Sequence, residues 1–311
     1  MTIALISHTA CLAHDTGAGH PERPERLTAV LDALDERSFP ALARHNAPLA
    51  DEQALLAVHD PAHVSAILSL DVREDELRAL DADTIVSAGS REAALRAAGG
   101  AMRGVDLVMD GTVRGAFVAV RPPGHHATPD RAMGFCLINN VAVAVQHARR
   151  AYGLERIAVA DFDVHHGNGT QDIVWAEPGT LFLSSHQSPC YPGTGERHER
   201  GAHSNIVNAP LPPGSGSDAF RHAWRDVLLP ALDDFAPQLL IVSAGFDAHR
   251  ADPLAQLSLD EADFSWITRE LVATMARHAP GRIVSLLEGG YDLAALAASA
   301  AAHVQALESA T

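Results

Sequence analysis

The chain has 311 residues, and its 23 basic residues, all arginine, stand against 39 acidic residues, which gives a formal net charge of −16. A hydrophobic content of 47% with 20% charged residues excludes a largely disordered chain. The negative charge repels phosphate backbones, which argues against direct nucleic-acid binding, and it favours cationic substrates.

Short apolar runs alternate with helix-like stretches along the chain. The runs predict buried parallel strands at Ile3–Ser7, Ala116–Val120, Ile157–Ala160, Leu181–Ser184, Leu239–Val242 and Ile283–Leu287. The other stretches predict helices at Arg91–Met109, Val141–Tyr152, Ser217–Leu232, Leu259–His278 and Leu293–Leu307, with Ser217-Asp218 and Ser258 as N-caps. This alternation predicts a single domain over residues 1–311, a three-layer α/β fold whose mostly parallel sheet carries helices on both faces.

Two segments fall outside the alternation. Asp71–Asp83 is rich in carboxylates and is predicted to be an acidic surface segment. Gln187–Ser217 is rich in Gly, Pro and His and is predicted to be a long loop. A loop of that length within a compact domain is often functional.

The composition also bears on location. No apolar run approaches the ~20 residues of a membrane span, and no basic residue precedes Arg23, so neither a span nor a secretory signal is expected. Cys11, Cys136 and Cys190 are widely spaced and form neither a disulfide framework nor a zinc motif. We therefore expect a protein of the reducing cytoplasm.

Polar clusters follow four of the predicted strands. They are Arg121–Ala127, Asp161–Gln171, Ser243–His249 and Glu288–Asp292. Because ligands in open α/β sheets bind beyond the carboxyl ends of the strands, these clusters are expected to meet at one edge of the sheet.

Asp163 and His165 are the sharpest pair within these clusters. In extended backbone, residues i and i+2 point the same way, so both side chains can reach one ion. Asp247, at another strand end, is the best third ligand. Three protein ligands leave a position open for water, which is typical of a catalytic zinc site. The alternative is a hydrogen-bonded pair at a strand end without metal.

His125 and His126 follow a Pro-Pro-Gly turn and suit general acid and base roles, because histidine titrates near neutrality. Asp161 and Asn168 are available to orient them. Tyr291 follows two glycines and could donate a hydrogen bond to an oxyanion. The alternatives are two surface histidines and a packed aromatic ring. His198 and His203, in the long loop, are left without an assigned role.

The motifs RPPGHHA, GFCLINN, DFDVHHGNGTQ, YPGTG, SAGFD and EGGYD occur in this order, and HPERPER spans His20–Arg26. Together they resemble the zinc-dependent histone deacetylase superfamily from about Gly19 to Asp292. The form with Asn168, where class I enzymes carry Asp, is nearer to class II enzymes and bacterial deacetylase-like amidohydrolases. The resemblance implies the arginase–deacetylase fold, with an eight-stranded parallel sheet.

The resemblance also implies roles for individual residues. Asp163, His165 and Asp247 match the zinc ligands, and Tyr291 matches the catalytic tyrosine. The tandem histidines match as the pairs His125–Asp161 and His126–Asn168. A structural potassium ion would use Asp161, Asp163, His165, Ser184 and Ser185, partly through backbone oxygens.

The pocket is implied in the same way. Arg26 would lie by its inner end, Phe135 would form one wall of the acyl-lysine tunnel, and Gly134 and Gly289 would lie beside it. Tyr191 stands where Phe is usual on the opposite wall. Leu254 stands where polyamine deacetylases can carry an acidic gatekeeper, which favours an acyl-lysine substrate. No motif identifies the rim residue that holds the substrate backbone.

The resulting hypothesis is a zinc-dependent amidohydrolase that removes acetyl or other acyl groups from acyl-lysine and releases acetate. One alternative is an acetylpolyamine amidohydrolase that acts on small N-acetylated amines. A second is a non-catalytic protein that binds acyl-lysine. A third, a binuclear manganese ureohydrolase, is disfavoured because Gly167 stands where that site needs a further carboxylate.

Overall fold

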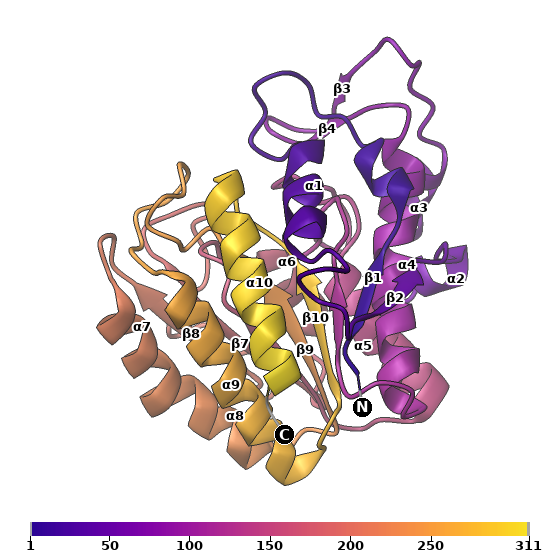
Figure 1. Ribbon diagram of the computed structural model, residues 1–311. Coiled ribbons are helices and arrows are strands. Elements are labelled where there is room, and N and C mark those ends of the chain that lie inside the picture. Colours follow the sequence, from indigo (N-terminus) through magenta and orange to yellow (C-terminus); the bar gives the residue numbers. More distant parts are fainter. Residues whose placement is uncertain (1, 310–311) are drawn as a thin grey trace.

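The computed structural model describes residues 2–309, and eight strands of this part of the chain form one parallel sheet (Figure 1). Their order is β2–β1–β5–β10–β9–β6–β7–β8. The strands are β1 (Ala4–Ser7), β2 (Ala43–Asn46), β5 (Ala116–Val118), β6 (Ile157–Asp161), β7 (Thr180–Gln187), β8 (Ile206–Leu211), β9 (Leu239–Ala244) and β10 (Ile283–Leu287). A small antiparallel pair, β3 (Arg78–Ala79) and β4 (Ile85–Val86), lies apart from this sheet.

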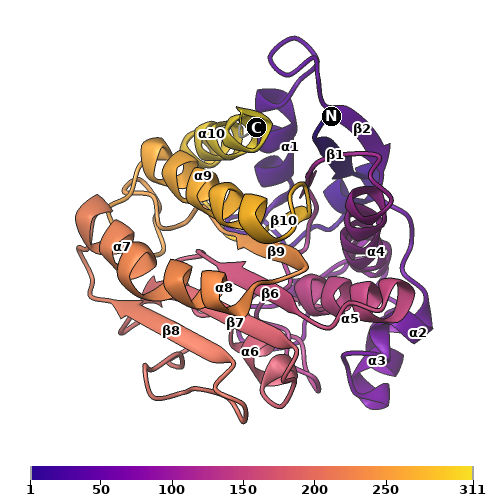
Figure 2. The same ribbon diagram turned by 90° about the horizontal axis from the view of Figure 1, so that it is seen from below.

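Helices cover both faces of the sheet (Figure 2). One face carries α1 (Pro24–Ala33), α7 (Ser217–Ala223), α8 (Leu229–Phe235), α9 (Glu261–His278) and α10 (Leu293–Ser309), and the other carries α4 (Ser90–Met109) and α5 (Asn140–Tyr152). The remaining helices are η1 (Thr9–Leu12), α2 (Glu52–Leu55), α3 (Pro61–Leu68), α6 (Asn168–Val174) and a π-helical turn, Trp224–Leu228, between α7 and α8. The predicted three-layer α/β fold is confirmed.

The core lies between the sheet and its two helical layers. β5, β6, β7, β9 and β10 are buried along their whole length, as apolar strands covered on both faces should be. In the middle of α4, a Cβ atom on Gly99 would lie 2.0 Å from the carbonyl oxygen of Pro48. The glycine that weakens the predicted helix is therefore what lets α4 approach the loop after β2.

Two edge strands escaped the sequence prediction. β2 is a polar strand with alternating half-buried and exposed residues, so it has no apolar run. β8 lies inside Gln187–Ser217, which was predicted to be a loop throughout, and that prediction was wrong. Pro210 is tolerated in β8 because the strand pairs only with β7, at the edge of the sheet.

Both predicted N-caps were also misplaced. The cap of α9 is Asp260, not Ser258, because its carboxylate accepts a hydrogen bond from the Ala262 amide at 3.0 Å. Ser217 is the first residue of α7, where its hydroxyl donates to Asp263 at 2.6 Å. Of the helices in residues 2–309, none is both long and apolar enough to cross a membrane.

Several histidines are structural and lie in the interior. His303 is 1% exposed and contacts the hydroxyls of Thr268 and Ser285 at 2.6 and 2.8 Å. Burial lowers the pKa of His303 to about 3. His166 and His186 are buried in the same way, and burial lowers their pKa values to about 3 and about 4. Much of the histidine content thus serves as neutral, hydrogen-bonded core.

The low pKa values of these histidines predict that the folded protein loses stability in acid. The unfolded chain binds protons below a histidine pKa of about 6.5, whereas the folded chain does not until about pH 3. The contribution of these histidines to the free energy of unfolding is therefore fully present above about pH 6.5 and decreases as the pH drops. His303 alone accounts for about 2 kcal/mol between pH 7 and 5.

We expect His303→Gln to flatten the slope of unfolding free energy against pH by about one proton over this range, as measured by urea denaturation. His198→Gln, at an exposed position, is the control and should keep the slope. An unchanged slope in His303→Gln would contradict the assignment.

Candidate active site

The four strands that precede the polar clusters are neighbours in the sheet, in the order β5–β10–β9–β6. His125 and His126 follow β5, Tyr291 follows β10, Asp247 follows β9, and Asp163 follows β6. Because the strands are parallel, their carboxyl ends lie at one edge, and the predicted meeting of the clusters is observed.

Asp163, His165 and Asp247 converge at the centre of this edge. One ligand atom from each lies within 4.8 Å of the other two, and all three residues are buried. The Nδ1 atom of His165 lies 3.2 Å from Asp163 Oδ1 and 3.1 Å from Asp247 Oδ2. Two carboxylates and an imidazole are a donor set that zinc accepts.

Electrostatics favour a cation at this point. Burial and the charge of Asp163 raise the pKa of Asp247 to about 7. Burial also opposes ionisation of Asp163, but His125 and His165 outweigh it and hold the pKa of Asp163 below its usual range. Two buried carboxylates in contact with one imidazole are thus short of positive charge, and the residues fit a divalent ion.

Backbone amides hold the carboxylates in place. Val164 N–H donates to Asp247 Oδ1 at 2.8 Å, His165 N–H donates to Asp163 Oδ1 at 2.9 Å, and Gly289 N–H donates to Asp163 Oδ2 at 2.8 Å. Each carboxylate keeps its orientation without a movable side-chain partner. This is the outer-shell support that metal ligands usually have.

The tandem histidines contact the expected partners. His125 Nδ1 lies 3.0 Å from Asp161 Oδ2, and His126 Nδ1 lies 2.8 Å from Asn168 Oδ1. Burial lowers the pKa of His125, but the carboxylates of Asp163 and Asp161 outweigh burial and raise it to about 10. Burial and the neighbouring His125 lower the pKa of His126 well below its usual value. One ring is therefore cationic and the other neutral.

Tyr291 is 9% exposed and lines a cavity that is also lined by His126 and His165. Its ring makes an edge contact with Phe135, with ring centres 5.8 Å apart, and the Arg26 guanidinium lies 4.8 Å from its ring centre. Arg26 is fully buried and pairs with Glu22 at 3.0 Å.

The cavity has a volume of about 220 Å³ and brings together most of the predicted site. It is lined by Asp83, His126, Gly134, Phe135, His165, Tyr191, Leu254 and Tyr291. The Tyr191 ring makes edge contacts with His126 and His165, with ring centres 5.1 and 6.3 Å apart. The lining combines the aromatic rings of Phe135, Tyr191 and Tyr291 with polar groups, which suits an apolar chain that ends in a reactive group.

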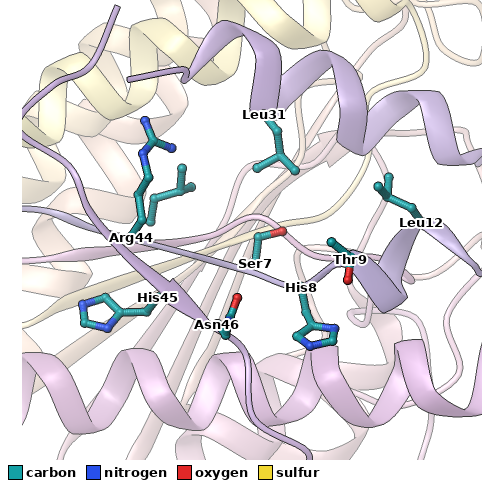
Figure 3. A pocket seen from close by; sticks show the side chains of 9 residues that line it. Ser7, His8, Thr9, Leu12, Leu31, Arg44, His45 and Asn46 are labelled. Carbon is teal, nitrogen blue, oxygen red and sulfur yellow. The ribbon is translucent and has the colours of Figure 1, made fainter. Parts of the chain in front are cut away.

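Another cavity, of about 270 Å³, lies beside β1 and the edge strand β2 (Figure 3). Figure 3 shows Leu31 of α1 above it and Ser7 and Asn46 near its centre. The residues that line it include arginine, histidines and leucines but no carboxylate and no member of the Asp163–His165–Asp247 cluster. The smaller cavity is therefore the better candidate for a reaction.

The residues implied for potassium lie next to each other. Asp161 and Ser184 are register partners on β6 and β7. The Ser184 hydroxyl contacts His186 Nδ1 at 2.9 Å, and the Ser185 hydroxyl accepts a hydrogen bond from the Trp224 indole at 3.0 Å. Both hydroxyls thus have protein partners, so an ion here would depend on Asp161 and backbone oxygens.

Sequence reasoning missed three acidic residues of this site. Asp83 was placed on an acidic surface segment, yet it lines the cavity. Glu288 follows a predicted strand and has no predicted role, but its Oε2 atom accepts hydrogen bonds from the amides of Gly124 and His125 at 2.7 and 3.2 Å. Asp252 contacts the backbone of Tyr291. The short spacing of Asp252 from Asp247 and Leu254 was the one signal available.

Comparisons with known proteins agree with this geometry. Residues 20–307 match the family model of the histone deacetylase domain. The chain is 40% identical over 283 residues to a histone deacetylase-like amidohydrolase of Pseudomonas aeruginosa, covering 88% of this chain and 73% of the relative. It is 37% identical over 302 residues to a probable deacetylase of Archaeoglobus fulgidus, covering 94% and 82%.

A solved structure gives the same result in three dimensions. The crystal structure of an HDA15 HD domain superposes with a TM-score of 0.92 at 36% identity, covering 99% of this chain and 88% of that one.

The ligand cluster predicts metal-dependent stability. Zinc added to chelator-treated protein should raise the thermal unfolding midpoint by several degrees, because an ion that binds the folded chain stabilises it. Asp247→Asn should lose most of this increase and most of the bound zinc, measured by calorimetry and elemental analysis. Asp51→Asn, which changes a carboxylate at the start of α2, is the matched control. Equal zinc content in Asp247→Asn and the parent would contradict the ligand assignment.

Proposed function

The chain belongs to the histone deacetylase family and is a hydrolytic deacetylase, and we propose that it removes acyl groups from acyl-lysine in a zinc-dependent reaction. The observation that carries this proposal is the buried Asp163–His165–Asp247 cluster beneath an aromatic cavity that also holds His126 and Tyr291. Residues 1–311 would act as one catalytic domain.

Zinc would be held by Asp163, His165 and Asp247, one ion per chain, and when bound it supplies a Lewis acid for the amide carbonyl and lowers the pKa of a water. Potassium would lie near Asp161 and Ser184 as a structural ion.

His126 is the proposed proton carrier. An amide oxygen only accepts, so the contact of His126 Nδ1 with Asn168 Oδ1 puts the proton on Nδ1 and leaves Nε2 as a free acceptor. The pKa of His126, lowered by burial and by His125, keeps the ring neutral and able to take a proton from the attacking water. His126 would then return this proton to the leaving amine.

His125 and Tyr291 would stabilise charge. His125, paired with Asp161, would offset the negative charge of the carboxylates around it. Burial raises the pKa of Tyr291 well above its usual value, so the hydroxyl keeps its proton and can donate it in a hydrogen bond to the oxyanion.

The cavity walls support acyl-lysine as the substrate class. Phe135 and Tyr191 present aromatic rings to a four-carbon chain, and Leu254 adds an apolar side chain that would not attract a distal ammonium. Asp83, which lines the same cavity, is the proposed rim residue that accepts a hydrogen bond from the substrate backbone.

All three cysteines are free thiols within the described chain, which supports a reducing, cytoplasmic setting.

Acetate release tests the substrate class directly. We expect the zinc-loaded protein to hydrolyse an acetyl-lysine peptide with a higher kcat/KM than N-acetylputrescine or N-acetylcadaverine. Leu254→Glu should shift the ratio toward the two small amines, because it adds a carboxylate for their free ammonium. A preference of the parent protein for the small amines would favour the polyamine alternative. One bound zinc with no turnover of any acyl amine would favour a binding protein.

Tyr291→Phe tests the mechanism. The variant should fold and bind zinc as the parent does, because the ring is kept, but kcat should fall by about 10²–10³-fold through loss of an oxyanion donor. Thermal unfolding and zinc content are the controls. Full activity of this variant would remove the proposed role of the hydroxyl.

A further inference from the structure

Tyr291 follows Gly289 and Gly290, which have no side chain to restrict their backbone. Gly290 has a φ of +122°, a conformation that side chains rarely adopt, and Gly289 precedes it. The peptide group between Gly290 and Tyr291 sets the direction in which the tyrosine ring leaves the backbone. Something outside this segment must therefore hold that peptide group.

Two buried side chains hold it, one at each end. Arg26 Nε donates to the Gly290 carbonyl oxygen at 2.5 Å, and Asp252 Oδ2 accepts a hydrogen bond from the Tyr291 N–H at 2.8 Å. Arg26 is fully buried and Asp252 is 8% exposed. Burial raises the pKa of Asp252, and its backbone hydrogen bonds and the charge of Arg26 oppose this rise.

The second oxygen of Asp252 reaches a different part of the pocket. Asp252 Oδ1 accepts a hydrogen bond from the Leu254 N–H at 2.9 Å, which turns the chain so that Leu254 lines the cavity. The loop that carries Asp252 is itself anchored, since the Asp252 N–H donates to the His249 carbonyl at 2.9 Å and the Leu259 N–H donates to the Ala248 carbonyl at 3.1 Å. The loop that carries the Asp252 carboxylate is therefore held in place by backbone hydrogen bonds.

We propose that Asp252 is a positioning residue that sets the catalytic hydroxyl of Tyr291 and the cavity wall at Leu254 with one carboxylate. This inference rests on the proposed function, because it assigns Tyr291 a role in turnover. Asp252 does not touch the reacting atoms and acts through the backbone of its two partners.

Asp252→Asn is the direct test, because an amide offers one acceptor oxygen where the carboxylate offers two. Its NH₂ group would face an N–H donor, so one of the two backbone bonds is lost. We expect kcat on an acetyl-lysine peptide to fall by about 10–100-fold, with zinc content unchanged and KM within about 3-fold. Asp51→Asn is the control and should match the parent, because Asp51 caps the N-terminus of α2, where its carboxylate accepts a backbone hydrogen bond at 2.8 Å.

A double-mutant cycle separates positioning from general damage. If Asp252 acts through Tyr291, Asp252→Asn should lower kcat by less than about 3-fold in the Tyr291→Phe background. An equal loss in both backgrounds, or a parental kcat in the single variant, overturns the proposal. Asp252→Glu keeps the charge that faces Arg26 but moves the oxygens, and it carries the same test should Asp252→Asn fail to fold. Absence of turnover in the parent would count against the proposed function instead.

Discussion

The burial of four carboxylates at one edge of the sheet is the constraint on which the rest of this structure depends. Asp161, Asp163, Asp247 and Glu288 are each no more than 1% exposed. Charges removed from water are costly unless they are paired and hydrogen-bonded. The loops beyond β5, β6, β9 and β10 compensate the cost of burial, because their backbone amides and the rings of His125 and His165 contact these carboxylates.

These contacts also connect the loops around the proposed site to one another. Glu288 accepts from the turn that carries His125, and Asp163 accepts from the turn that carries Tyr291. The group that holds one loop thus belongs to another, so a change in one loop is felt by its neighbour. Glu22 extends the arrangement inward, since it pairs with both Arg26 and Arg121. The proposed metal would complete this balance of charge.

The central strands and the polar clusters after them could be predicted from the sequence, because buried parallel strands are apolar on both faces and parallel topology brings their ends together. The edge strand β2 could not, since a half-exposed polar strand has no such pattern. The hydrogen bonds that Arg26 and Asp252 make to the peptide group before Tyr291 could not be predicted either. Arg26 and Gly290 are 264 residues apart, and Asp252 and Tyr291 are 39 apart, so only the fold reveals these contacts.

The net charge of the chain can be related to the same buried carboxylates. Only part of the net charge of −16 is buried, because the buried residues hold seven carboxylates and two arginines, and the rest lies nearer the surface. The segment that delivers Asp83 to the pocket also borders a cavity lined by Asp15, Glu74, Asp75 and Glu76. A negative field at this scale attracts a cationic substrate and repels anions. The approach of a substrate is thus biased by the outer charges, while the proposed chemical step depends on the buried site.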